Sequence, residues 1–405
     1  MSLIQSLKDF NYRQKESLVF FLASYFFSLF NYPLVRASTT STFLEVFGAK
    51  SSPQAWLWTV VFLSIAVSVS NWLQGKLSVQ KVFLIISFFS SILFYFTDEL
   101  TGLRYLGFLP FIWKDIYIVL QVHLLLAFIN QALNKDLFKK LVGPIGAIGS
   151  LGGVLGGLLT SYLSSSSEMG PILGVASFCV LLPGIIFLKT QNDFSDEQKE
   201  ESKKRSPLSS FTPEVKKYVF YIATVVALTQ FVINIADFQF NISFEKHVIG
   251  RELRTEYLGH LYSLTNFLTL ILQFFFVPLI LSRVKEKKFH YFIPISYFIG
   301  HLLLVFVGGG FWGIAGFYLY LKASDYSFFS SAKELLYQPL SSAQKYGAKY
   351  ITDMLAYRFS KALIALILIY VQSLFMINIL MVVFLILWIW AISRLFKVYP
   401  NQNTQ

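Results

Sequence analysis

The chain of 405 residues is poor in cysteine and in charge. Its one cysteine, Cys179, lies in an apolar stretch, so the sequence predicts neither a disulfide framework nor a cysteine-based metal site. Only 14% of the residues are charged, whereas about 25% is typical of soluble domains. No G-x-x-x-x-G-K-[ST] sequence occurs, so no nucleotide-hydrolysing P-loop is predicted. We expect neither a cofactor nor enzymatic activity.

Apolar residues dominate instead: 55% of the chain is hydrophobic, and its mean hydropathy is +0.59. The sequence separates into about twelve apolar stretches, each long enough to cross a bilayer at roughly 1.5 Å per helical residue. Backbone amides in hydrocarbon must bond within their own segment, so we predict an all-α membrane protein. The predicted spans are residues 17–35, 55–74, 82–97, 109–132, 142–163, 170–188, 218–238, 258–282, 289–307, 311–331, 350–372 and 374–393.

Basic residues set the predicted orientation. The net charge is +12, and most of the 34 Lys and Arg residues fall in loops on one side of the predicted spans. Positive charge is retained on the cytoplasmic side, so both termini are predicted to be cytoplasmic and no nucleic-acid partner is expected. The N-terminal segment lacks the apolar core of a cleaved signal and the Arg-rich character of a transit peptide, which favours a bacterial inner membrane.

The longest polar segment follows the sixth span and is rich in charge, Ser and Pro, which predicts a mobile cytoplasmic linker. It divides the chain into an N-terminal six-helix half over 1–188, a linker over 189–217 and a C-terminal six-helix half over 218–405. Two such halves are the arrangement of major-facilitator transporters, in which the substrate binds between the halves near mid-membrane. We therefore predict a major-facilitator-like fold.

The fifth span contains a stripe of glycines in GPIGAIGSLGGVLGGLL. Small residues at spacings of three and four let a neighbouring backbone approach closely. This pattern predicts tight helix packing, and a surface that slides during alternating access is compatible with it. The residues predicted to pack are Gly146, Gly149, Gly153 and Gly157.

In the eleventh span, Arg358 and Lys361 stand one turn apart and so share a helix face. Two cations within a bilayer cost several kcal/mol unless an anion or a water-filled cavity meets them, which predicts an anionic substrate. The alternative is that both side chains extend to the cytoplasmic interface.

Two further spans contain acidic residues. Lys322 and Asp325 are one turn apart in the tenth span, where an internal ion pair is predicted. Asp237 is the one carboxylate of the seventh apolar stretch. It is either a proton site or the partner of Arg36 or of a neighbouring helix.

The fourth span has a polar load that lipid would not tolerate on every side of the helix. We predict that Gln121, His123 and Lys114 face the central cavity. His123 is then either a hydrogen-bonded packing residue or a proton relay.

The segment from Ser324 to Lys361 contains three motifs in sequence: K-E-x-x-Y-x-P-L, then K-x-x-x-K-x-x-x-D, and then R-x-x-K. In this pattern it resembles the ATP/ADP carrier family of plastids and obligate intracellular bacteria. The resemblance implies a major-facilitator-like fold, an anionic substrate and a substrate role for Lys361, and it includes Asp353 as a coupling or ion-pair residue. The matching residues are Lys333, Glu334, Tyr337, Pro339, Leu340, Lys345, Lys349, Asp353, Arg358 and Lys361.

Weaker similarities to that family extend into both halves, as in YPLVRASTTSTFLEVFGA around Arg36. In nucleotide-exchanging members a lysine follows the arginine that corresponds to Arg36, and this chain has Thr39 there. A glutamate of their fourth span is replaced by the pair Lys114 and Asp115. Any nucleotide exchange is therefore expected to be weaker or differently selective.

Taken together, these features predict a secondary transporter of an anionic, phosphorylated, nucleotide-like metabolite, working by exchange or proton coupling. The residues predicted to bind substrate are Arg36, Lys114, Gln121, Arg358 and Lys361. The alternatives are a transporter or flippase of an amphipathic lipid-like anion, and a non-transporting membrane scaffold. Membrane lipids are the other expected partner, and a monomer is expected.

Overall fold

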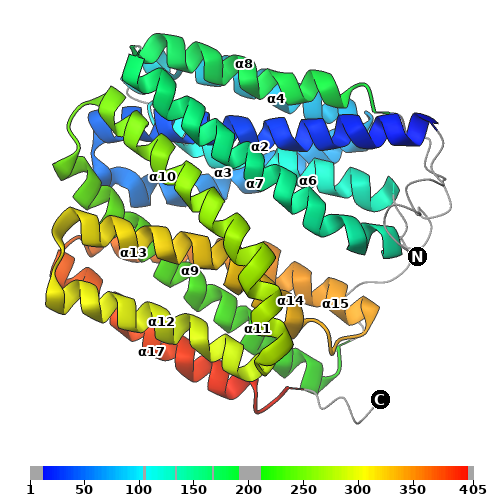
Figure 1. Cartoon of the computed structure of the whole chain (residues 1–405), viewed down its shortest axis with the longest axis vertical. Coiled ribbons are helices and arrows are strands. Elements are labelled where there is room, and N and C mark those ends of the chain that lie inside the picture. Colours follow the sequence, from blue (N-terminus) through cyan, green and yellow to red (C-terminus); the bar gives the residue numbers. More distant parts are fainter. Residues whose placement is uncertain (1–11, 104–105, 133–134, 167, 191–210, 400–405) are drawn as a thin grey trace. The chain divides into compact units, whose positions relative to one another are not determined.

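The computed structural model describes residues 12–103, 106–132, 135–166, 168–190 and 211–399. Within these ranges the chain forms helices and no strands (Figure 1). Most of the predicted linker over 189–217 lies outside the described residues.

The helices of the first half of the sequence begin and end as follows: α2 Tyr12–Phe47, α3 Ser52–Gln74, α4 Val79–Tyr95, α5 Thr97–Gly102, α6 Leu109–Ala132, α7 Lys135–Ser166 and α8 Met169–Phe187. Those of the second half are α9 Pro213–His247, α10 Arg251–Ile271, α11 Val277–Arg283, α12 Glu286–Val307, α13 Gly310–Ser324, α14 Ser330–Leu336, α15 Ser342–Lys349, α16 Tyr357–Tyr370 and α17 Leu374–Leu395. Three π-helical segments join neighbouring helices: η5 Leu272–Phe276, η6 Asp325–Phe329 and η7 Tyr350–Ala356.

About twelve membrane helices were predicted, and the structure confirms this architecture. Among the described residues, 9 helical runs are long and apolar enough to cross a membrane, and Val79–Tyr95 is a shorter apolar helix. Two more runs contain a π-helical segment: α13, η6 and α14 follow one another without a break, as do α15, η7 and α16.

The first helix is longer than its apolar stretch indicates. The sequence predicts a span over 17–35, whereas α2 continues to Phe47 and so includes Arg36 and Thr39. The polar residues from Ser38 to Thr42 are buried against neighbouring helices. Two of their hydroxyls bond to the preceding turn: Ser38 Oγ donates to the Leu34 carbonyl at 2.7 Å and Thr39 Oγ1 to the Val35 carbonyl at 2.6 Å. A hydropathy profile cannot detect such a polar but packed helical turn.

Contacts group the described residues into two compact units. Unit 1 comprises residues 12–48, 61–190 and 248–267, and unit 2 comprises residues 49–60, 211–247 and 268–399. Each unit thus takes in a short piece of the other half of the sequence.

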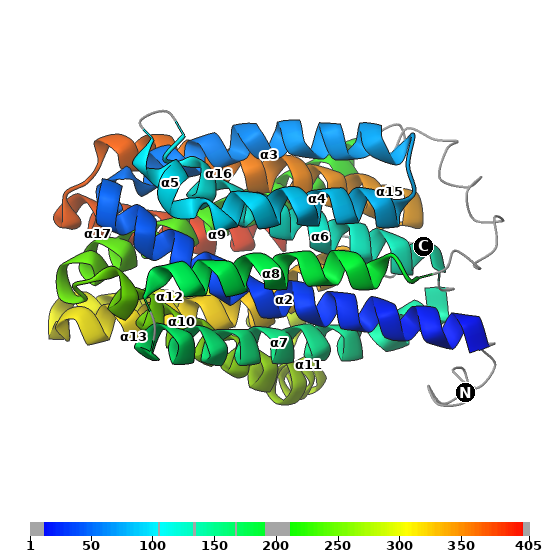
Figure 2. The ribbon, with the colours of Figure 1, turned by 90° about the horizontal axis from the view of Figure 1, so that it is seen from above.

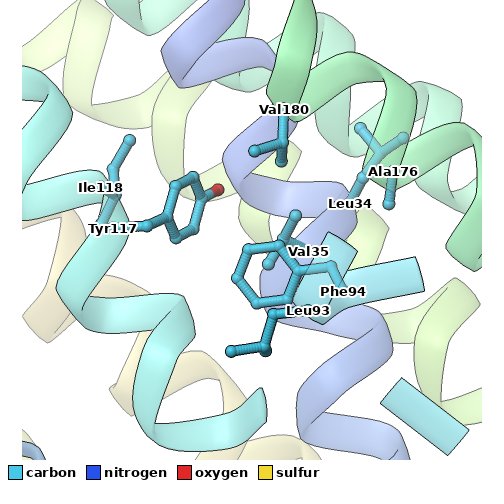
Figure 3. Close-up of a cluster of buried hydrophobic side chains, with 8 residues drawn as sticks. All are labelled: Leu34, Val35, Leu93, Phe94, Tyr117, Ile118, Ala176 and Val180. Carbon is cyan, nitrogen blue, oxygen red and sulfur yellow. The ribbon is translucent and has the colours of Figure 1, made fainter. Parts of the chain in front are cut away.

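In unit 1, α2 lies alongside α7 and α8 and also packs on α6, while α4 packs on α6 and α8 (Figure 2). A cluster of buried side chains from α2, α4, α6 and α8 forms part of its core (Figure 3). Tyr117 lies in this cluster, and its hydroxyl donates to Asn31 Oδ1 at 2.8 Å. Asn31 in turn donates to the Cys179 carbonyl at 3.1 Å, so the polar atoms of this core are paired across three helices.

The glycine stripe of α7 contacts two helices of unit 1. On one side, a Cβ at Gly152 would lie 2.6 Å from the carbonyl oxygen of Phe26 in α2, and one at Gly156 would meet that of Phe30. A Cβ at Gly149 would meet the Leu29 side chain. The backbones of α7 and α2 are therefore too close to admit any side chain between them.

On its other side, α7 meets α10. A Cβ at Gly157 would lie 2.7 Å from the carbonyl oxygen of Gly259, and one at Gly153 would lie 2.6 Å from the Asn266 side chain. Ser161 Oγ donates to the Glu256 carbonyl at 2.9 Å along the same contact. Gly146 is half-buried, and its packing role stays a prediction.

In unit 2, α9 is the central helix and packs against α13, α16, η7 and α17. Trp388 of α17 is fully buried, and its ring lies against those of Tyr297 and Phe329. The polar side chains of α9 are thereby held inside a bundle of helices.

Gly156→Ala should destabilise the folded protein, because its Cβ would press on the backbone of Phe30, which cannot rotate away. Overpacking of this kind costs about 1–3 kcal/mol and should lower the Tm of purified protein in detergent. Gly174→Ala in α8 is the control, since no atom lies within 4 Å of its added Cβ. Equal Tm values for the two variants would contradict the close approach of α7 and α2.

Candidate functional site

Unit 2 contains a buried ion pair between two helices. Lys322 Nζ of α13 lies 2.8 Å from Asp237 Oδ2 of α9, and the two side chains are only 8% and 18% exposed. The sequence predicted that Lys322 would pair with Asp325 on its own helix. The pair formed instead is with Asp237, because α9 packs directly against α13 and presents a carboxylate to it.

Asp325 is the first residue of the π-helical segment η6 and is partly buried. Its carboxylate makes no ion pair or hydrogen bond to any residue that the structure describes. The charged groups that act on it are Lys322, Lys333 and Asp237. Each of these lysines forms its ion pair with another carboxylate, Lys322 with Asp237 and Lys333 with Asp353.

The segment that resembles the ATP/ADP carriers holds itself together by matched charges. Lys333 of α14 lies 2.8 Å from Asp353 of η7, and Glu334 lies 2.7 Å from Lys349 of α15. The hydroxyl of Tyr337 lies 2.6 Å from that of Thr352. Five residues of the motif are therefore used to join α14 to the α15 and η7 run, and Asp353 is an ion-pair residue.

The motif is also joined to the centre of unit 2. The hydroxyl of Tyr218 in α9 donates to the Leu336 carbonyl at 2.7 Å, at the end of α14. Tyr218, Tyr337 and Leu336 are all almost fully buried. The motif therefore has a structural function, whatever the protein does.

Arg358 differs from the charges around it. It lies at the start of α16, is half-buried, and its guanidinium donates to Met354 Sδ at 3.7 Å. No carboxylate pairs with it among the residues that the structure covers. Lys361 is also half-buried and follows one turn later, on the same face of α16.

In unit 1, Arg36 of α2 lies between aromatic rings. Its guanidinium carbon is 4.4 Å from the centre of the Tyr262 ring of α10 and 5.7 Å from that of the Tyr32 ring. Such contacts fix the orientation of a guanidinium without neutralising its charge. Arg36 is half-buried, so its polar end is positioned by packing.

Lys114 and Gln121 of α6 are buried between helices. Lys114 is 4% exposed; its Nζ donates to the Phe111 carbonyl at 3.1 Å and lies 3.5 Å from Asp115 Oδ1. Gln121 is fully buried and donates to Ser87 Oγ of α4 at 2.9 Å. These contacts give both residues a packing role, and a part in substrate binding stays a prediction. His123 is exposed.

Two ion pairs at the start of α10 were not foreseen from the sequence. Arg254 lies 2.6 Å from Glu45 at the end of α2, and Arg251 lies 2.8 Å from Asp98 of α5. Their partners are 209 and 153 positions away, so no local spacing could have indicated the pairs.

No group of three or more His, Cys, Asp or Glu residues could hold a metal ion among the described residues.

The fold is similar to that of solved membrane transporters. A mutant of the nucleoside transporter NupG is 14% identical, with a TM-score of 0.68 over 93% of this chain and 100% of that one. A D-xylose-proton symporter is 12% identical, with a TM-score of 0.69 over 94% and 97%. A bacterial homologue of the iron transporter ferroportin is 12% identical, with a TM-score of 0.67 over 96% and 99%.

No protein-family model matches the chain, and no curated protein matches its sequence. At these identities the structural likeness establishes the fold alone: an all-α membrane protein of the major-facilitator type. The fold predicted from the sequence is confirmed. These structural neighbours are membrane transporters and not enzymes.

Tyr337→Phe should destabilise the protein by about 1 kcal/mol, because it removes a buried hydrogen bond to Thr352 while Thr352 keeps its bond to the Ala348 carbonyl. The measurement is the Tm of the purified protein. Tyr350→Phe is the control: Tyr350 lies in η7, as Thr352 does, but it is 47% exposed, so its loss of a hydroxyl should leave the Tm unchanged. If Tyr337→Phe behaved like the control, the motif would not join α14 to η7.

Proposed function

We propose that this protein is a secondary transporter of an anionic, phosphorylated, nucleotide-like metabolite and works by alternating access. The observation that carries the proposal is Arg358, a half-buried cation in a membrane helix with no carboxylate partner among the described residues. An unbalanced guanidinium at this depth is costly unless an anion or a water-filled cavity meets it. Arginine also suits phosphate, because its planar fork can bind two oxygens at once.

The surrounding motif sharpens this proposal. Four of its other charges form the pairs Lys333 with Asp353 and Glu334 with Lys349. A segment that neutralises four of its charges internally would gain nothing structurally from a further unbalanced arginine. Arg358 is therefore better explained by a ligand than by packing, and Lys361 on the same face adds a second positive charge.

We propose that Arg36 also meets the substrate. Its guanidinium lies against the rings of Tyr262 and Tyr32, which fix its orientation. Lys114 and Gln121 complete the set proposed from the sequence. Because Lys114 contacts Asp115 and Gln121 contacts Ser87 in buried positions, we propose that both residues contribute to substrate binding indirectly, by fixing the position of α6.

The resemblance to the ATP/ADP carriers and the fold shared with the nucleoside transporter NupG support a nucleotide-like substrate. We further propose a monomer in the bacterial inner membrane, with membrane lipids around it, both termini in the cytoplasm and two six-helix halves. A flippase of a lipid-like anion or a non-transporting scaffold would each give a different result in the experiments that follow.

Arg358→Ala and Lys361→Ala should weaken uptake of labelled ATP or ADP by cells that express the protein. Loss of one charge that faces a desolvated anion costs about 2–5 kcal/mol in binding, so the apparent affinity should fall by more than tenfold. Arg394→Ala is the matched control, because Arg394 is an exposed cation near the end of α17. Wild-type affinity in both variants would refute the site. Absence of uptake by every form would favour the flippase or the scaffold.

Thr39→Lys tests the departure from the nucleotide-exchanging carriers. Thr39 is 1% exposed and donates to the Val35 carbonyl at 2.6 Å, so a lysine there would introduce a buried charge. Without ligand the variant should have a lower Tm than wild type. ATP should raise its Tm by more than it raises that of wild type, because the triphosphate would neutralise the new charge. Equal shifts would place Thr39 away from the anion.

A further inference from the structure

Both lysines of the helix formed by α13, η6 and α14 pair with carboxylates of other helices. Lys322 is committed to Asp237 at 2.8 Å, and Lys333 to Asp353 at 2.8 Å. Asp325 lies between these two lysines in the sequence and pairs with neither. The five side chains together carry one negative charge too many when all are ionised.

The groups that face Asp325 come from each element around η6. On its own continuous helix they are Lys322 and Lys333, and neighbouring helices contribute Asp237 of α9 and Tyr297 of α12. The segment η5, which also contacts η6, has no titratable side chain. The excess negative charge therefore lies on the carboxylates of Asp237 and Asp325. Lys322 contacts Asp237 directly and is three residues before Asp325 in the sequence.

A carboxylate left ionised without a partner at membrane depth costs several kcal/mol, and binding a proton removes that charge. Lys322 is three residues before Asp325 and so can reach it along the helix. It can therefore pair with Asp237 while Asp325 holds the proton, or with Asp325 while Asp237 holds it. Because the first pairing ties α9 to α13 and the second does not, movement of the proton changes how two helices are joined.

The backbone supports this placement. Asp325 opens a π-helical segment, and π-helical turns are frequent at functional sites because they redirect side chains. Asp325 itself keeps α-helical dihedrals, and its backbone N–H bonds to the Leu321 carbonyl, so it stays one turn from Lys322.

We propose that Asp325 is a proton-binding site and that Lys322 is shared between it and Asp237. This inference rests on the transporter function proposed above, and it makes transport proton-coupled. A proton from one side of the membrane binds the Asp325 carboxylate while Lys322 neutralises Asp237. After the conformational change the proton leaves to the other side. The step at Asp325 is the binding and release of a proton, so it needs no oxidant or reductant.

Infrared spectroscopy of the purified protein tests the site without any substrate. Wild type should show the carbonyl band of a protonated carboxylic acid at neutral pH, and the band should disappear on further alkalinisation. Asp325→Asn should lose this band. Glu214→Gln, an exposed carboxylate at the start of α9, is the control and should retain it. Absence of the band in wild type, or its persistence in Asp325→Asn, would overturn the proposal.

Asp237→Asn provides a second test if Asp325→Asn fails to fold. It frees Lys322 to pair with Asp325, so the carboxylate becomes ionised and the neutral-pH band should again be lost. A band of wild-type strength in Asp237→Asn would show that Lys322 is not shared.

Proteoliposomes then connect the site to transport. With labelled ATP as the probe, a pH gradient should drive accumulation by wild type at least tenfold above that by Asp325→Asn, while exchange without a gradient continues in both. Equal gradient-driven accumulation would refute coupling at Asp325. If wild type moves no ATP at all, the proposed substrate fails, and the infrared band still decides whether Asp325 binds a proton.

Discussion

A charge inside a membrane-spanning helix must be met by an opposite charge, by water or by a ligand, and this constraint organises unit 2. Asp237 is met by Lys322 in this way, and the charges of the adjoining motif are also paired, Lys333 with Asp353 and Glu334 with Lys349. Two residues of opposite sign, Arg358 and Asp325, have no such partner among the described residues. We propose that Arg358 meets an anionic substrate and that Asp325 binds a proton.

The backbone departs from the regular α-helix at the same places. Two of the three π-helical segments begin at or contain a carboxylate of the charge network, Asp325 in η6 and Asp353 in η7. A π-helical turn shifts the side chains that follow it relative to the preceding face. In η6 the side chains shifted in this way are those that follow Asp325, and Asp325 itself stays one helical turn from Lys322. In unit 1 the corresponding adjustment is made by glycines, which let α7 approach both α2 and α10.

The fold was predictable because hydropathy reports how each segment partitions into lipid. About twelve apolar segments, divided by a polar linker after the sixth, are compatible with few known membrane folds. The close packing expected around Gly153 and Gly157 likewise follows from residue size. Helix ends were not predictable where polar residues are buried by neighbours, as from Ser38 to Thr42.

Ion-pair partners were the weakest part of the sequence prediction. The pair of Lys322 with Asp237 joins residues 85 positions apart, and that of Arg254 with Glu45 joins residues 209 apart. Spacing along one helix favours Asp325 as the partner of Lys322, but it carries no information on which carboxylate a neighbouring helix presents. In the motif near Lys361, the residue types indicated charge chemistry correctly, yet only the structure separates the charges that join α14 to η7 from Arg358.

The most direct test of a substrate role for Arg358 is the ligand-dependent thermal stability of the protein. Purified protein would be heated with a panel of nucleotides, inorganic phosphate, other anionic metabolites and uncharged analogues, in parallel with Arg358→Ala. A ligand present at about 100 times its Kd stabilises the folded state by about 2.7 kcal/mol, which is a readily measured increase in Tm. If Arg358 meets the substrate, the stabilising compounds will be anions, and Arg358→Ala will lose the increase. Stabilisation by uncharged compounds, or equal stabilisation of the variant, would contradict it.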